Sequence, residues 1–112
     1  MDDGTTAAFE STHRIAADLR AFEGHFPGAP VLPGAYLLAL VLHQLEQQPA
    51  LRARLGATLQ VQQVKFLAPV GPGHTLRLRL EARPQGIGFS LHRGATLVAR
   101  GQLSGTEQAP AP

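Results

Sequence analysis

Hydrophobic and polar residues alternate regularly in the second half of the chain. Between residues 76 and 81, leucines alternate with charged residues, and this period of two predicts a strand with one buried and one solvated face. The same period returns over residues 87–91 and 97–103, after turns at Gly86 and Gly94. These three segments therefore predict antiparallel strands joined by short turns.

The segment before these strands changes phase. Residues 59 and 61 are apolar in one phase, whereas residues 64 and 66 are apolar in the other. A strand keeps its apolar side chains on one face only if an extra residue is inserted where the phase changes. The sequence therefore predicts a further strand with a β-bulge near Gln62 and Gln63.

The centre of the chain is predicted to be a helix. Pro33 suits the first turn of a helix that continues to about Gln47, with Pro49 closing its far end. Every residue from Ala35 to Leu42 is apolar, so this helix must be wrapped by other structure. The run is far shorter than the roughly 20 residues that span a bilayer, so no membrane association is expected. A short helical segment is expected around residues 50–55.

The first half is less regular. Ile15, Ala17 and Leu19 stand at period two, which predicts a strand over residues 13–19, with a short helix as the alternative. The whole pattern predicts an α+β domain of about five antiparallel strands, the last four in a meander, wrapped around one apolar helix. We expect flexible ends over residues 1–11 and 105–112, and one domain over residues 12–104.

Composition narrows the classes of function. The 112 residues include no cysteine, so disulfides and thiolate metal sites are excluded. The formal charge of +2 is too dispersed to indicate a nucleic-acid-binding protein. The first four residues lack the pattern of a signal peptide, so a cytoplasmic location is expected. A domain this small buries only roughly 60 to 70 % of its unfolded surface, so self-association would stabilise it.

One segment has the composition of a rigid turn beside a site. From His25 to Gly34 the chain holds three prolines and two glycines, which restrict the backbone path and lead it into the predicted helix. A histidine at the head of such a turn is a candidate for chemistry, because its ordinary pKa lies near neutral pH. The alternative is a structural histidine that caps the turn.

Two motifs carry a family resemblance. Residues 24–34, Gly-His-Phe-Pro-Gly-Ala-Pro-Val-Leu-Pro-Gly, resemble the active-site motif of the hotdog-fold 3-hydroxyacyl-acyl-carrier-protein dehydratases of bacterial fatty acid synthesis. Residues 64–73, Val-Lys-Phe-Leu-Ala-Pro-Val-Gly-Pro-Gly, resemble the strand and turn that follow in that family. The Val-Lys-Phe strand is also similar to the small dehydratase-like proteins of aryl polyene pigment pathways.

The resemblance implies a hotdog fold and a defined substrate class. It implies a homodimer with a continuous sheet and a site at the interface, with a heterodimer with another hotdog dehydratase as the alternative. The substrate would be a 3-hydroxyacyl thioester on the phosphopantetheine arm of acyl carrier protein, and the product the trans-2-enoyl thioester. No separate cofactor is implied.

The resemblance also assigns roles to residues. His25 would be the base that removes the α-proton, and the Gly34 amide would donate to the thioester carbonyl at the positive end of the helix. The carbonyl of Val31 would orient the histidine ring. The family's acidic partner should stand fourteen positions after His25, but Ala39 occupies that place.

Three accounts of Ala39 remain open. First, another group replaces the acid: His43 lies one helical turn further on the same face, and Glu23 would point to the same side as His25 in extended chain. Second, the protein is a catalytically impaired partner subunit or acyl-binding protein. Third, the fold serves as a thioesterase, which the missing acid does not favour.

Several other residues have two readings. Tyr36 either lines the acyl tunnel or packs in the core. No acid or histidine stands at metal-ligand spacing from His13, His74 or His92, so no metal site is expected. The charged side of the strand over residues 76–83 either meets an acidic carrier protein or is simply solvated; its arginines are Arg77, Arg79 and Arg83.

Overall fold

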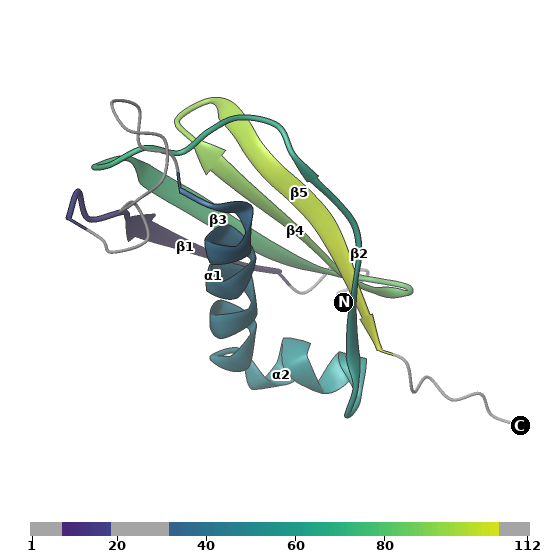
Figure 1. The fold of residues 1–112 in the computed structure, drawn as a ribbon. Helices are drawn as coiled ribbons and strands as arrows, with labels where there is room; N and C mark the ends of the chain where they lie inside the picture. Colours follow the sequence, from purple (N-terminus) through teal and green to yellow (C-terminus); the bar gives the residue numbers. More distant parts are fainter. Residues whose placement is uncertain (1–7, 19–31, 106–112) are drawn as a thin grey trace, which may run out of the picture.

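The computed structural model describes residues 8–18 and 32–105 of the chain, and it forms an α+β domain there (Figure 1). The sheet has five strands. The elements in chain order are β1 (Ala8–Arg14), α1 (Gly34–Glu46), α2 (Pro49–Arg52), the 3-10 helix η2 (Ala53–Leu55), β2 (Leu59–Phe66), β3 (Thr75–Arg83), β4 (Gly86–Arg93) and β5 (Thr96–Gly105).

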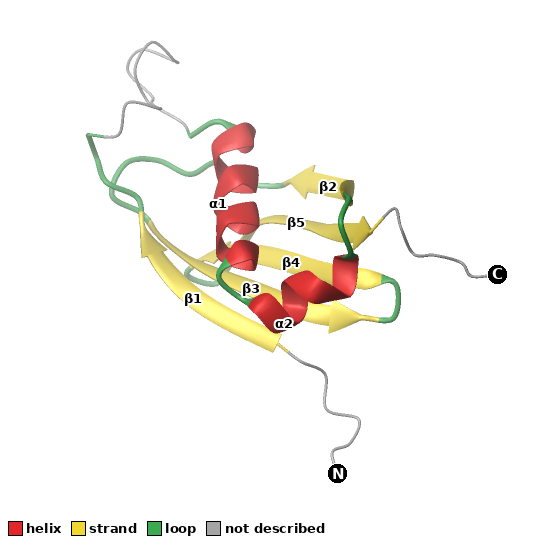
Figure 2. Cartoon of the chain, turned by 90° about the horizontal axis from the view of Figure 1, so that it is seen from below, coloured by secondary structure: helices red, strands yellow, loops and turns green. Residues whose placement is uncertain are grey.

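All strand pairs are antiparallel, in the order β1-β3-β4-β5-β2 (Figure 2). The meander is confirmed for β3 to β5, but the expectation that β2 belongs to it is wrong. β2 pairs with β5 at one edge, and β1 takes the place beside β3. The segment after β2 crosses the end of the sheet, where the Leu67 amide donates to the Val98 carbonyl at 2.7 Å. Each of the two edge strands, β1 and β2, is therefore followed by a long connection to the next element.

The first strand begins and ends earlier than its pattern predicts. β1 covers Ala8–Arg14, so the expected strand over residues 13–19 is wrong in its bounds. Ile15 is only 3 % exposed, but its backbone bonds to a loop: its amide donates to the His74 carbonyl and its carbonyl accepts from the Gly73 amide, both at 2.8 Å. Ile15, whose apolar side chain suggested that the strand continues, thus packs into the core just after the strand ends.

The predicted bulge in β2 is confirmed. The register with β5 shifts between Gln62 and Lys65, and Gln63 has a positive φ of 55°. Val61 pairs with Leu103, and Phe66 pairs with Ala99. Five positions separate Val61 from Phe66 on β2 but only four separate their partners on β5, so the bulge returns both side chains to the same face of the sheet.

Helix α1 crosses one face of the sheet and buries one row of its side chains (Figures 1 and 2). Leu37, Val41 and Leu45 are at most 3 % exposed, and their spacing of four residues places them on one helical stripe. The bounds agree with the predicted helix from residue 33 to about 47. The opposite stripe, which includes Ala35 and Ala39, is exposed within this chain. The expected wrapping of the helix is therefore only half complete.

The chain leaves α1 through the short helical segment that the sequence predicts. Leu51 in α2 and Leu55 in η2 are buried in the same core as α1. Within the described residues, no helix is long and apolar enough to cross a membrane. These short turns carry the chain to the sheet edge at which β2 begins.

The side of β1 that faces α1 carries a polar pair. Ser11 Oγ and His13 Nε2 are hydrogen-bonded at 2.6 Å, and both side chains are partly buried. Burial lowers the pKa of His13 from its usual 6.5, and the nearby charge of His43 on α1 lowers it further. This strand therefore holds a histidine that resists protonation.

Glycine is required at the turn between β3 and β4. Gly86 has a φ of +150°, and a Cβ atom there would lie 2.0 Å from the Leu103 carbonyl oxygen. We expect Gly86→Ala to lower the free energy of unfolding by about 3 kcal/mol, through a strained φ and a backbone clash. Gly94→Ala is the control, because φ is +61° there but no heavy atom lies within 4 Å, so about 1–2 kcal/mol is expected. Urea denaturation measures both, and equal losses would contradict the clash.

The lowered pKa of His13 predicts a pH-dependent stability. The unfolded chain binds a proton at this histidine more readily than the folded chain does, so the folded state loses stability as pH falls below the unfolded pKa of 6.5. Between about pH 7.5 and about pH 5.5, His13→Gln should therefore make the decline in unfolding free energy shallower. His92→Gln, on the opposite face of the sheet, is the control. An unchanged slope in His13→Gln would show that His13 titrates normally.

Candidate functional site

The sequence places the candidate site at the start of α1, and the structure describes part of it. The predicted base His25, the candidate acid Glu23 and the orienting residue Val31 lie outside the described residues. Gly34 is the first residue of α1, and Tyr36, Ala39 and His43 follow on the same helix. The geometry of the site is therefore built from α1 and from the segments packed against it.

The N-terminus of α1 presents backbone donors. Pro33 precedes the helix with extended φ and ψ of −63° and 146°, and among the described residues no side chain caps the helix. The Pro33 carbonyl accepts from the Tyr36 amide at 3.0 Å and from the Leu37 amide at 3.4 Å. The Gly34 amide precedes these bonds, and the first turn contains no acidic residue. This end of the helix thus suits an oxygen on which negative charge develops.

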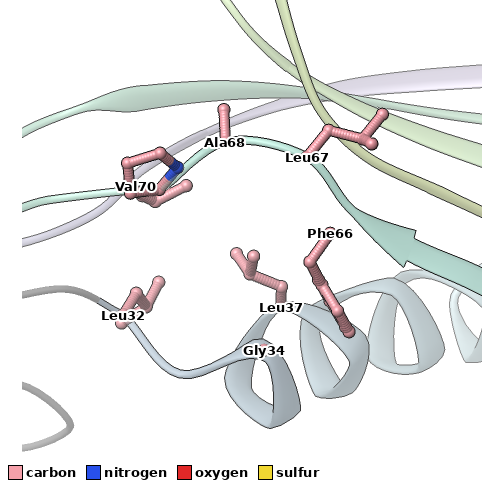
Figure 3. Close-up of a pocket in the computed structure, with 8 residues that line it drawn as sticks. Leu32, Gly34, Leu37, Phe66, Leu67, Ala68 and Val70 are labelled. Atoms are coloured by element: carbon pink, nitrogen blue, oxygen red, sulfur yellow. The ribbon is translucent and has the colours of Figure 1, made fainter.

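Phe66 packs on the first turn of α1 (Figure 3). A Cβ atom at Gly34 would lie 3.0–3.2 Å from three atoms of the Phe66 ring, which is closer than ordinary van der Waals contact. The ring remains 51 % exposed although it comes from the end of a strand. Glycine at position 34 therefore allows the ring of β2 to lie directly beside the helix N-terminus.

An apolar pocket of about 390 Å³ opens at this contact (Figure 3). Helix α1 forms one wall, and the segment that follows β2 forms the other. The Leu32 amide donates to the Val70 carbonyl at 2.8 Å, which ties the two walls together. The described residues that line the pocket are Leu32, Gly34, Leu37, Phe66, Leu67, Ala68, Pro69 and Val70. Apolar walls with backbone donors at one end suit an acyl chain that ends in a polar carbonyl.

Sequence reasoning missed this second wall. The segment from Leu67 to Val70 has no period, because it lies between strands, so nothing marked its side chains as pocket residues. The sequence offers one signal, the adjacent apolar residues Phe66 and Leu67. In the structure both are about half exposed at the end of a strand. Apolar residues that stay exposed at the end of an edge strand indicate a surface to be covered.

A second hollow of about 240 Å³ lies on the outer side of α1 and is lined by Tyr36, Ala39, Leu40 and His43. Ala39 and His43 share one face of the helix, as their spacing of four predicts. Tyr36 lines this hollow and, partly buried, also packs against the hydrophobic core. The structure thus brings an imidazole beside the methyl group of Ala39, where the resemblance led us to expect a carboxylate.

None of the described carboxylates lines either hollow. Glu46 pairs with Arg52 at 3.0 Å, and Glu10 pairs with Arg79 at 3.0 Å. Glu81 lies 3.6 Å from Arg79 on the opposite face of the sheet from α1. Within this part of the chain, the titratable side chains that share a hollow with Ala39 are therefore Tyr36 and His43.

The other histidines lie apart from one another. The Gly71 amide donates to His74 Nδ1 at 2.9 Å, so this ring holds a loop. His92 lies on the face of the sheet that points away from α1, opposite Arg77. In the described segments, no three side chains of histidine, aspartate or glutamate gather into a group that could hold a metal ion.

Comparison with known proteins places the chain in a family. A family model for ApeI-like proteins, described as ApeI dehydratase, matches residues 2–102. The chain is 38 % identical over 73 residues to a 3-hydroxyacyl-[acyl-carrier-protein] dehydratase FabZ of Gluconacetobacter diazotrophicus, covering 60 % of this chain and 45 % of the relative. It is 36 % identical over 83 residues to a FabZ of Alkaliphilus metalliredigens, covering 66 % and 54 %. The chain thus spans about half the length of these curated relatives.

A solved structure confirms the predicted hotdog fold. The dehydratase heterocomplex ApeI:P of Xenorhabdus doucetiae superposes with a TM-score of 0.74 at 24 % identity, over 92 % of this chain and 90 % of that one. At this identity the likeness establishes the fold alone. The family model covers nearly the whole sequence, and on that match the chain belongs to the ApeI-like dehydratase family.

Proposed function

We propose that the protein eliminates water from a 3-hydroxyacyl thioester carried by an acyl carrier protein. The observation that carries this proposal is the apolar pocket that meets the uncapped N-terminus of α1 at Gly34, in a chain of a dehydratase family. The pocket suits the acyl chain, and the helix end suits the thioester carbonyl. The product is the trans-2-enoyl thioester.

The proposed mechanism divides the elimination among three groups. His25 accepts the α-proton, and the electron pair of that C–H bond moves toward the thioester carbonyl. The Gly34 amide donates to the carbonyl oxygen as its negative charge develops. The electron pair then returns to form the Cα–Cβ double bond while the carbon–oxygen bond of the 3-hydroxyl group breaks, and the departing hydroxyl takes a proton and leaves as water. Each step uses side chains and backbone of the protein, and the proposal includes no cofactor besides the substrate's phosphopantetheine arm.

His43 is the proposed donor of the second proton. It shares a hollow of about 240 Å³ with Ala39, so its imidazole lies one helical turn from the position of the missing carboxylate. An imidazole can donate a proton near neutral pH. Glu23 stays the alternative acid, and Val31 stays the proposed orienting residue for His25.

A second subunit is proposed to cover the outer side of α1. Ala35 and Ala39 are exposed there, and Val61, Phe66 and Leu67 on or after the edge strand β2 are 37–52 % exposed. Burial of these apolar surfaces would complete the wrapping that the helix lacks in one chain. We propose a homodimer; a heterodimer with another hotdog dehydratase is the alternative. A location in the cytoplasm remains a prediction.

Two observations favour a second function. Ala39 cannot donate a proton, and a structural neighbour of this chain is a dehydratase heterocomplex. The chain would then bind acyl groups or assist an active partner as a catalytically impaired subunit. Thioester hydrolysis, the third account of Ala39, has no described acid in either hollow to support it.

Turnover of a 3-hydroxyacyl carrier protein separates these functions. We expect the wild type to form the enoyl product, measured by mass spectrometry of the carrier protein. His25→Ala and His43→Ala should each lower kcat by about 10²- to 10⁴-fold, because each removes a proton-transfer group. His92→Ala is the control, because this histidine lies on the opposite face of the sheet from α1.

Two outcomes would contradict the proposal. An inactive wild type that gains turnover in Ala39→Glu would establish the impaired-subunit function. Turnover that persists unchanged in His25→Ala would rule out the proposed base. If His25→Ala is inactive but His43→Ala is not, the second proton comes from another group, and Glu23→Gln tests the alternative.

The oligomeric state tests the proposed second subunit. Size-exclusion chromatography with light scattering should give twice the 11.9 kDa mass of the chain. Ala35→Glu should shift the protein toward the monomer, because it introduces a charge into the apolar surface while the helix N-terminus tolerates a carboxylate. Thr12→Glu, on the exposed outer side of β1, is the control. A monomeric wild type would contradict the homodimer.

A further inference from the structure

The second wall of the apolar pocket, formed by the segment after β2, is held at both ends by backbone hydrogen bonds. At its start, the Leu67 and Ala68 amides both donate to the Val98 carbonyl on β5, at 2.7 Å and 3.3 Å. At its end, the Val70 carbonyl accepts from the Leu32 amide at 2.8 Å. These bonds fix the two ends of the wall and leave its middle to other contacts.

The middle of this wall is Pro69, and a side chain from another part of the sheet holds it. Proline has no amide hydrogen, so its carbonyl is the one backbone group through which it can be hydrogen-bonded. That carbonyl accepts a hydrogen bond from Nη1 of the Arg93 guanidinium. A charged donor makes such a bond stronger than a neutral donor does. Arg93 itself is not among the described residues that line the pocket, so the position of Pro69 depends on a residue outside it.

Arg93 is a well-fixed anchor because it is the last residue of β4. It pairs with Thr96 on β5, and the turn between them consists of Gly94, with a φ of +61°, and Ala95. A two-residue turn with positive φ matches the twist of the strands and holds a hairpin in one register. The segment after β2 passes beside this turn (Figure 1). The middle of the wall is therefore tied to a position that two paired strands fix.

The pocket is small enough for the position of this wall to matter. Its volume of about 390 Å³ is near the lower end of the roughly 300–1,000 Å³ that is typical of small-molecule sites. On the side of α1, Leu37 lines the pocket and is only 3 % exposed, so that wall cannot shift without disturbing the packed core. Pro69, in contrast, is exposed. The wall around Pro69 is therefore the one whose position can change the width of the pocket.

We propose that Arg93 is a specificity-determining residue for the acyl chain: through its bond to Pro69 it fixes the width of the pocket and so sets the longest chain that fits. The inference rests on the proposed function, because it takes the apolar pocket as the acyl site. A fixed wall discriminates between chains by exclusion, since one methylene in a hydrophobic pocket changes kcat/KM by about 10- to 200-fold. Arg93 acts through the wall and not on the substrate, so it is a positioning residue.

Binding of saturated acyl thioesters of N-acetylcysteamine provides the first test. These compounds lack the 3-hydroxyl group, so they cannot be dehydrated and they report binding alone. We expect the wild-type affinity, measured by isothermal titration calorimetry, to rise with chain length and to fall beyond a certain length, which we call the length limit. In Arg93→Ala this fall should be about tenfold smaller, because a released wall yields to the longer chain.

Further variants separate the hydrogen bond from a general effect on the fold. Arg93→Lys retains a charged donor and should keep most of the wild-type length limit. Arg77→Ala is the control, because it removes an exposed arginine from the neighbouring strand β3, opposite His92. It should change the affinity for each chain less than about twofold. If thermal denaturation shows that Arg93→Ala does not fold, Arg93→Gln takes its place, because its side chain is polar but shorter and uncharged.

Turnover provides the second test. The wild type and Arg93→Ala are compared on 3-hydroxyacyl carrier proteins whose chains lie within and beyond the length limit. The ratio of kcat/KM between the shorter and the longer chain should fall about tenfold in Arg93→Ala, through KM for the longer chain.

The outcomes distinguish the role of Arg93 from the proposed activity. An unchanged length limit in Arg93→Ala, or an equal shift in Arg77→Ala, would overturn the inference. Equal losses at every chain length would also overturn it, because they indicate a merely structural role. If the wild type binds acyl thioesters but does not turn over its substrate, the proposed dehydration fails, and calorimetry still decides the role of Arg93. If the wild type binds no acyl chain, the pocket is not an acyl site and the inference is wrong.

Discussion

The burial of a single stripe of α1 determines the arrangement of the candidate site. Leu37, Val41 and Leu45 bury almost all of their surface against the sheet, and this packing fixes the rotation of the helix about its axis. Gly34 is thereby held against Phe66, while Ala39 and His43 are left on the outer side. The helix therefore cannot be wrapped by its own sheet alone, and its outer side, which carries Ala39 and His43, faces the place where we propose a second subunit.

Much of the fold could be predicted from the sequence because period and phase are local properties. The alternation in β3, β4 and β5 and the phase change in β2 each depend on side chains within ten residues. The place of β2 at the edge could not be predicted this way, because strand order depends on pairing between distant segments. The end of β1 was predicted wrongly for a related reason. Ile15 follows the last residue that pairs with β3, Arg14, and its backbone bonds to the loop at His74. Its apolar side chain nevertheless continues the pattern that was read as a strand.

For the candidate site, too, the features that could be predicted are those that depend on local spacing in the sequence. The shared face of Ala39 and His43 follows from helical spacing, and the position of Gly34 follows from the Pro-Gly start of the helix. The apolar wall from Leu67 to Val70 was not foreseen, because a loop has no period to read. The hydrogen bond between Ser11 and His13 was missed because the strand was predicted to begin at residue 13, although residues two apart in one strand share a face. The roles of His25 as base and of Glu23 as alternative acid remain proposals.

The bulge at Gln63 also determines which side chains of β2 point to each face of the sheet. Lys65 lies outside and Phe66 inside only because the bulge takes up one extra residue in β2. If the same residues continued the ladder without a bulge, while the first half of the strand kept its pairing, the lysine would turn toward the helix and the aromatic ring toward solvent. A regular ladder of the same sequence would thus exchange the cationic and the apolar side chains of this edge. The bulge is therefore as important to the chemistry of this edge as the identity of any residue in β2.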